Sequence, residues 1–349
     1  MKTYNKILSF LLVVLLLLMA SGCKTEYFVT EKSFFNTTFY MATDKTLKED
    51  TKQNIFSFLL DLEDSFSISK ENSFISKFNA LEENESIEIS CLEKNLLNAC
   101  KNCYEFTNGA FNPATLSLLK SWKLSSDTFN NKTVFITPPT SLEIEKGLST
   151  LPYFELLNFE SDNLVKVNKD LQIDLGGVAK GYAVDEIVKM LKDTAISKGY
   201  ISIGGSSIYI YATDENLKVT HPRKGGEYIL SIDKNTLSNV SLSTSGDYVR
   251  FYMGKNGERF SHIIDTKTGC PTNTGFASVT VIGKNAQLTD AISTALCTFT
   301  KQEFLDFTKN KLLDCKVYAV YEKEKVVLTN ANESEFTLND NEYKIEYIK

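Results

Sequence analysis

Apolar residues along this chain follow helical spacing in some stretches and strand-like alternation in others, in no regular order. Helical spacing runs through residues 47–62 and 92–106, whereas alternation runs through residues 200–203 and 207–211. A doubly wound sheet would show strands and helices in strict alternation, and no fixed-period repeat or proline-rich linker divides the chain. The pattern therefore predicts an α+β fold in which residues 35–349 form a single unit. Further helices are predicted at residues 143–148, 180–191, 287–300 and 302–313, further strands at residues 277–282, 316–321, 325–328 and 342–348, another strand ending at residue 175, and a surface loop at residues 125–131.

The amino terminus has the layout of an export signal. Two lysines precede an apolar run at residues 7–20, and small residues then lead into Cys23. The run is too short to span a hydrocarbon core of about 30 Å comfortably. Its ending resembles a bacterial lipobox, which implies cleavage after residue 22 and a lipid on Cys23; an uncleaved anchor or an ordinary signal peptide is the alternative. We expect residues 1–22 to be a lipoprotein signal peptide and residues 23–34 a tether to the outer, extracytoplasmic face of the cell membrane.

The charge of the chain argues against a nucleic-acid partner. The formal net charge is −6, and removal of Lys2 and Lys6 with the signal peptide takes it to −8. Nucleic-acid binding requires clustered lysines and arginines to meet the phosphates, and no basic stripe occurs in the sequence. We therefore expect no nucleic-acid partner.

Six cysteines remain once Cys23 is set aside. An even number permits disulfides in an exported protein, but a mature chain of this length can bury a large core without them. Cys100 and Cys103 form a C-x-x-C inside a predicted helix, with no second C-x-x-C and no nearby histidine to complete a zinc site. We expect buried free thiols, with disulfides or a redox or metal role as alternatives. The six are Cys91, Cys100, Cys103, Cys270, Cys297 and Cys315.

Two polar clusters contain glycine turns that suit a phosphate or a sugar. Residues 174–185 read Asp-Leu-Gly-Gly-Val-Ala-Lys-Gly-Tyr-Ala-Val-Asp, with a helix predicted from Lys180. Free N–H groups at such a turn and helix start attract anions; the alternative is a strand-to-helix turn capped by Asp174. Residues 244–250 supply hydroxyl, N–H and guanidinium donors, and the alternative there is a hairpin turn. The candidate ligands of this second cluster are Thr244, Ser245, Gly246 and Arg250.

Two further clusters supply a histidine and a carboxylate. His262 is one of two histidines in the chain. It is the second residue of the sequence Ser-His-Ile-Ile-Asp-Thr-Lys-Thr-Gly at residues 261–269. It is a candidate base or a structural histidine. Asp290 and Thr294 are four residues apart on a predicted helix and share a face. A carboxylate and a hydroxyl in that position can contribute to a magnesium shell; the alternative is a helix cap.

In their order and spacing these clusters resemble the motifs of the FAD:protein FMN transferase (ApbE) family. Upstream, residues 39–43, 73–79 and 109–113, followed by Trp122, resemble further motifs of the same family. The resemblance extends from about residue 35 to residue 300, which is nearly the whole mature chain. It implies a fold related to the T-fold, a single α+β unit with FAD bound in a cleft.

The resemblance also implies roles for individual residues. His262 matches the catalytic base proposed for the family, and Asp265 is expected to orient its imidazole or contact the flavin nucleotide. Gly177, through its carbonyl, Asp290 and Thr294 match a Mg²⁺ shell. Positions that match flavin-binding residues are Met41, Ala110, Phe111, Asn112, Asp174 and Lys180.

The implied activity is Mg²⁺-dependent transfer of FMN from FAD, the substrate, to a Ser or Thr hydroxyl of an exported or membrane-associated flavoprotein, with release of AMP. The alternatives are a Mg²⁺-dependent FAD pyrophosphatase and a flavin-binding lipoprotein without turnover. One departure from the family pattern bears on this choice. Ser69 stands where many members have a tyrosine that stacks on the nucleotide, and a lost stacking ring costs about 1 kcal/mol of affinity. Milder departures are Ala42 for glycine, Asn112 for aspartate, Ser206 for asparagine and Thr266 for proline.

Overall fold

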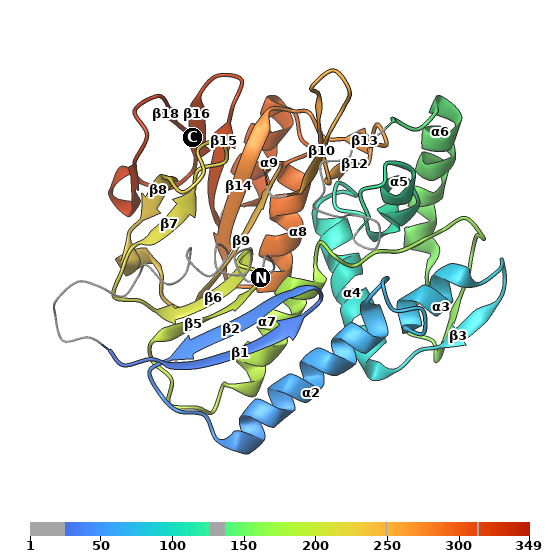
Figure 1. Cartoon of the computed structure of the whole chain (residues 1–349), viewed down its shortest axis with the longest axis horizontal. Helices are drawn as coiled ribbons and strands as arrows, with labels where there is room; N and C mark the ends of the chain where they lie inside the picture. Colours follow the sequence, from blue (N-terminus) through green and yellow to red (C-terminus); the bar gives the residue numbers. More distant parts are fainter. Residues whose placement is uncertain (1–24, 126–136, 249, 313) are drawn as a thin grey trace, which may run out of the picture.

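A nine-stranded sheet, antiparallel except at one edge, forms the centre of the protein (Figure 1). The computed structural model describes residues 25–125, 137–248, 250–312 and 314–349. The strands follow the order β1-β2-β5-β6-β9-β14-β15-β16-β18, and only β16 and β18 pair in parallel. Their bounds are β1 (Phe28–Phe34), β2 (Thr37–Thr43), β5 (Gly199–Ile203), β6 (Ser207–Ala212), β9 (Val240–Gly246), β14 (Phe276–Gly283), β15 (Lys316–Tyr321), β16 (Val326–Thr329) and β18 (Lys344–Tyr347).

Helices cover one face of this sheet. Helix α8 packs on β9 and β14, α7 packs beside α8 and on β5 and β6, and α4 contacts both helices from outside. The apolar face of α4 explains its place, because Leu96, Cys100 and Cys103 are buried while its charged residues face outward. The helices are α2 (Glu49–Phe66), α3 (Phe74–Ala80), α4 (Cys91–Phe106), α5 (Leu116–Ser121), α6 (Ser141–Thr150), α7 (Ala179–Met190), α8 (Ala286–Leu296) and α9 (Lys301–Lys311).

A second, three-stranded sheet covers the opposite face. It has the order β17-β8-β7 and buries an apolar layer that includes Ile229, Leu230 and Ile232 against Leu242 and Tyr318 of the large sheet. Successive side chains of β9 point alternately to the helices and to the second sheet, because neighbouring residues of a strand point to opposite faces. The strands of the second sheet are β7 (Leu217–Thr220), β8 (Tyr228–Ile232) and β17 (Phe336–Leu338).

Mixed helix and sheet confirm the predicted α+β class, and most predicted elements lie within a few residues of their expected bounds. The strand predicted to end at residue 175 is wrong. Residues 171–175 are irregular, and the side chain of Asn79 both donates to the Ile173 carbonyl (2.9 Å) and accepts from the Ile173 N–H (2.7 Å) in place of a strand partner. The helix predicted through residue 300 ends at Leu296, because Thr300 caps the next helix with Glu303.

The folded part begins earlier than the sequence indicated. The tether predicted for residues 23–34 is wrong for residues 28–34, because Phe28–Phe34 is β1 and pairs along its length with β2. Cys23 and the predicted signal peptide lie outside the described residues, as does most of the loop predicted at residues 125–131. In the part of the chain that the structure describes, none of the helices combines the length and the apolar character that a membrane crossing needs.

Three of the cysteines are buried free thiols as predicted, namely Cys100, Cys103 and Cys297, while Cys91 is exposed. Burial raises the pKa of the Cys103 thiol to about 12, so this thiol stays protonated at neutral pH and packs as a small apolar group.

Candidate functional site

The first turns of α7 and α8 meet with no room for a side chain between them. A Cβ built on Gly181 would lie 2.3 Å from the carbonyl oxygen of Ala286. One turn further along α7, Asp185 accepts the N–H groups of Ala286 (2.8 Å) and Gln287 (2.9 Å) and so caps the start of α8. The carboxylate of Asp185 is mostly buried, which raises its pKa to about 6. This pairing fixes where α8 presents Asp290.

Gly181→Ala is therefore expected to destabilise the protein. The neighbours of the new methyl group would be backbone atoms that cannot rotate away, so overpacking should cost about 1–3 kcal/mol of unfolding free energy. Urea titration followed by circular dichroism measures the change. Gly225→Ala is the matched control, since nothing lies within 4 Å of a Cβ there. Equal stability of the two variants would contradict the close contact.

Asp290 is nearly buried, at 3% exposure, and is held by its surroundings. Its carboxylate accepts the Gly181 N–H at 3.2 Å and lies 3.4 Å from the Lys180 ammonium. The same ammonium donates to the Gly176 carbonyl at 2.9 Å. Lys180 thus joins the glycine turn to the carboxylate of α8.

Residues of two other segments lie close to Thr294, which follows Asp290 by one turn of α8. The hydroxyl of Ser245 lies 3.2 Å from that of Thr294. Gly177 is close to both Phe111 and Thr294, because its built Cβ would lie 3.0 Å from the Phe111 ring and 3.8 Å from the Thr294 hydroxyl. A carboxylate, a hydroxyl and a backbone carbonyl are hard oxygen donors of the kind Mg²⁺ takes, with water and phosphate oxygens completing the shell. Among the described residues no group of three or more His, Cys, Asp and Glu side chains is arranged to hold a metal ion.

The structure separates Thr244 from this cluster. Ser245 points toward α8, whereas the hydroxyl of Thr244 pairs with that of Thr280 at 2.9 Å on the neighbouring strand. Gly246 is needed for its size, since a Cβ would lie 2.6 Å from the Ala277 carbonyl. Met41 is fully buried in β2.

Asn112 and Asp174 hold the backbone around the cluster. The Asn112 amide accepts from the Ala114 N–H (2.9 Å) and donates to the Leu151 carbonyl (3.2 Å), which fixes the turn after the buried pair Ala110 and Phe111. Asp174 accepts the N–H of Gly176 at 3.0 Å and so shapes the glycine turn. Nearby, a cavity of about 190 Å³ is lined by residues that include Ile68, Asn79, Leu116 and Gln172.

His262 lies at a bend between β11 (Arg259–Ser261) and β12 (Ile264–Asp265). Its Nδ1 is 3.0 Å from the Arg250 carbonyl oxygen. A carbonyl only accepts, so Nδ1 carries the proton and Nε2 is the basic nitrogen of the neutral ring. Desolvation, followed by the charges of Arg250 and Lys180, lowers the pKa of the half-buried His262 imidazole to about 4. The imidazole is therefore neutral at pH 7.

The role predicted for Asp265 as the residue that orients His262 is wrong. Its carboxylate accepts from the Lys267 N–H (2.9 Å) and the Thr268 hydroxyl (3.1 Å). Both donors belong to the turn that follows the two-residue strand β12, so the Asp265 carboxylate stabilises that turn. The Arg250 carbonyl orients the imidazole instead. The side chain of Arg250 is exposed.

Sequence reasoning gave no separate role to three residues that hold the site together. Asn79 replaces a strand partner for the segment before Asp174, Asp185 caps α8, and Asp247 binds two arginines. Each lies inside one of the motifs already noted, as the last or an inner residue. Their position in those motifs was the available signal, but their partners are distant in the sequence.

The chain is similar to known proteins in both sequence and structure. The ApbE family model matches residues 32–319. The chain is similar to an FAD:protein FMN transferase of Haemophilus influenzae, 26% identical over 349 residues that cover 94% of this chain and 96% of the relative. It is also similar to an FAD:protein FMN transferase of Buchnera aphidicola subsp. Schizaphis graminum, 30% identical over 248 residues that cover 70% of this chain and 69% of the relative.

Solved structures share the fold. The flavin transferase ApbE from Vibrio cholerae has a TM-score of 0.71 at 22% identity, with coverage of 90% of this chain and 96% of that one. An ApbE protein from Thermotoga maritima has a TM-score of 0.74 at 26% identity, with coverage of 88% and 98%. The large sheet with its helical layer is therefore an architecture that these proteins have in common.

Proposed function

This chain belongs to the ApbE family and is an enzyme of the FAD:protein FMN transferase type, and we propose that it moves FMN to a Ser or Thr hydroxyl of an acceptor protein in a Mg²⁺-dependent reaction that releases AMP. The observation that supports this most is the place of Lys180. Its ammonium lies 3.4 Å from the Asp290 carboxylate and also helps to lower the pKa of His262. The charge of Lys180 therefore acts on both the Asp290 carboxylate and the His262 imidazole.

The reaction forms one P–O bond and breaks another. The acceptor oxygen attacks the phosphorus of the FMN half of FAD, and the bond from that phosphorus to the bridging oxygen breaks, so that AMP leaves with the electron pair. The proton of the hydroxyl goes to Nε2 of His262, since Nδ1–H is already engaged with Arg250. Catalysis of such a transfer consists mainly of alignment and of offsetting charge on phosphate oxygens.

The donor set at α8 fits a magnesium ion. Asp290, Thr294 and the Gly177 carbonyl would hold it, and the bound ion would offset the negative charge of the pyrophosphate. Lys180 supplies a further positive charge at the same place. Ser245 lies within reach of Thr294 and adds a hydroxyl for a phosphate oxygen.

The test is to incubate the purified protein with FAD and Mg²⁺, with and without candidate flavoprotein acceptors. AMP and protein-bound flavin are measured together. We expect AMP to appear only with the acceptor, in step with flavin on that protein. AMP formed equally fast without acceptor would assign an FAD pyrophosphatase. Ser69 is the residue that motivates this alternative, because it is exposed and has no ring to stack on the nucleotide. No AMP under either condition would assign a flavin-binding protein without turnover.

The proposed acceptor is an exported or membrane-associated flavoprotein, which requires the enzyme at the same membrane face. Cys23→Ala is expected to move the protein from the membrane fraction to the soluble fraction, because the substitution removes the site of the diacyl anchor. Such an anchor binds a membrane far more tightly than a single chain. Fractionation followed by immunoblotting measures this. Cys91→Ala is the matched control, since Cys91 is exposed and free and its loss should change nothing. A Cys23→Ala protein that stays in the membrane fraction would refute the lipid anchor.

A further inference from the structure

Asp247 is the centre of an ion-pair cluster outside the oxygen-rich site. It follows the last residue of β9, and Arg223 donates to both of its carboxylate oxygens, at 2.7 and 2.8 Å. A second arginine, Arg259, lies 3.8 Å from the same carboxylate and 3.4 Å from the Asp247 carbonyl. The Arg223 and Asp247 side chains are only 28% and 19% exposed. A bidentate pair with this burial is stronger and more directional than an ordinary surface salt bridge.

Two members of the cluster lie close in the chain to the two residues that meet at His262, because Asp247 is near Arg250 and Arg259 is near His262. Asp247 precedes Arg250 by three residues, and the Arg250 carbonyl accepts from Nδ1–H (3.0 Å) and from the backbone N–H (3.3 Å) of His262. Arg259 precedes His262 by three residues at the start of β11. Its guanidinium also stacks on the ring of Phe251, 3.8 Å from the centroid, in the strand that pairs with β11. The Asp247 carboxylate therefore lies three residues before Arg250 and contacts Arg259, three residues before His262.

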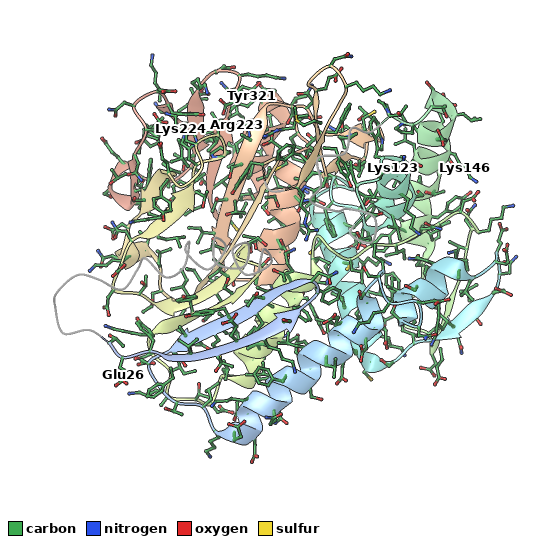
Figure 2. The ribbon with its side chains drawn as sticks, in the orientation of Figure 1. Glu26, Lys123, Lys146, Arg223, Lys224 and Tyr321 are labelled. Atoms are coloured by element: carbon green, nitrogen blue, oxygen red, sulfur yellow. The ribbon has the colours of Figure 1, made fainter. Side chains whose placement is uncertain are left out.

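Arg223 is itself held in a fixed loop after β7. Nδ1 of His221 accepts the N–H groups of Arg223 (3.0 Å) and Lys224 (3.1 Å), and Nε2–H donates to Asp340 at 3.0 Å. Lys224 donates to the same carboxylate at 2.6 Å. Figure 2 shows Arg223 and Lys224 next to one another where the second sheet meets the large one. The second sheet thus provides a rigid support from which Arg223 reaches Asp247.

We propose that Arg223 and Asp247 are a positioning pair that fixes the Arg250 carbonyl and the β11 end against His262, and through them the direction in which Nε2 points. This inference rests on the proposed function, in which Nε2 accepts the proton of the acceptor hydroxyl. The proposal gives neither residue a contact with the nucleotide or the reacting atoms. Their effect is on the imidazole alone, so FAD affinity should not depend on them.

The first test follows the His262 ring by ¹H NMR and needs no turnover. The chain has two histidines, so His262→Asn assigns the ring signals. In the wild type the His262 signal should titrate well below the usual value of about 6.5, because desolvation and the charges of Arg250 and Lys180 oppose protonation of the ring. In Arg223→Met a loosened ring gains water, and its midpoint should move up toward that value. An unchanged titration in folded Arg223→Met would overturn the proposal, whether or not the protein is a transferase.

The second test measures flavin transfer to an acceptor that the incubation with FAD and Mg²⁺ identifies. Arg223→Met should lower kcat by about 10–100-fold, as expected of a misdirected catalytic group, with KM for FAD unchanged. In single turnovers of the His262→Asn background it should cause no further loss, because the group it directs is gone. An equal loss in that background would show a general structural role and overturn the proposal.

Two more variants separate positioning from folding. Arg223→Lys keeps the charge but cannot bridge both oxygens, so both readouts should fall between wild type and Arg223→Met. This variant decides the question if Arg223→Met does not fold. Lys198→Met removes a salt bridge to Asp214 of 2.6 Å on another part of the surface and should leave kcat and the His262 titration unchanged. A similar effect of Lys198→Met would contradict the assignment to Arg223.

Discussion

Replacing His262 by asparagine is expected to abolish most of the flavin transfer while FAD still binds. The asparagine side-chain amide can keep the hydrogen bond that Nδ1–H makes to the Arg250 carbonyl, but it has no basic nitrogen. Loss of a general base costs about 10²–10⁴-fold in the chemical step. Stopped-flow or quenched measurements of AMP at saturating FAD give the rate, and fluorescence titration gives the FAD affinity. Weaker FAD binding with normal turnover would assign His262 to binding instead.

The pH dependence gives an independent check on the same residue. The base works only when neutral, and its pKa is lowered to about 4 by burial and nearby cations. The wild-type rate should therefore hold between about pH 7 and pH 5.5, where an ordinary histidine with a pKa near 6.5 would already lose activity. It should fall as the pH drops through about 4. Circular dichroism at each pH separates this loss from unfolding. A midpoint near 6.5 would mean that the imidazole is solvated during catalysis.

Asp290→Asn is expected to cause the other large loss, about 100-fold or more in Mg²⁺-dependent transfer, since the carboxylate of the proposed Mg²⁺ site is removed. Asparagine keeps an acceptor for the Gly181 N–H, so the fold should survive. Asp290→Ala would leave that N–H without its acceptor, at a cost of about 1–3 kcal/mol. Calorimetric titration with Mg²⁺ in the presence of FAD measures the affinity for the metal ion, and thermal unfolding measures the stability of the fold.

Two variants serve as comparisons for Asp290→Asn. Thr294→Ala should lose less activity, because a neutral hydroxyl is a weak ligand that water can replace. Asp306→Asn removes an exposed carboxylate of α9 and should have no effect on magnesium dependence. Wild-type activity of Asp290→Asn, with and without added magnesium, would show that Asp290 only supports the contact between α7 and α8.

The sequence by itself determined the local elements and the place of the chemistry along the chain. The spacing of apolar residues in α4 and α7 is local information, because a residue and its neighbours one turn away decide it. The motifs placed Asp290 and Thr294 on one helix face, and the structure has them there, with the Thr294 hydroxyl bonded to the Asp290 carbonyl at 3.1 Å. The same motifs identified the family.

Only the tertiary structure decided the partners of those residues. Asp290 meets Gly181, 109 positions away, and Arg223 meets Asp247 across two sheets. His262 is oriented by a backbone carbonyl, a group that every residue possesses and that no sequence pattern singles out. The segment before Asp174 looked like a strand because its residues alternate, yet an asparagine side chain took the hydrogen bonds that a strand partner would have made. Periodicity specifies which face of an element is buried, whereas the choice of partner depends on packing between segments that are remote in the sequence.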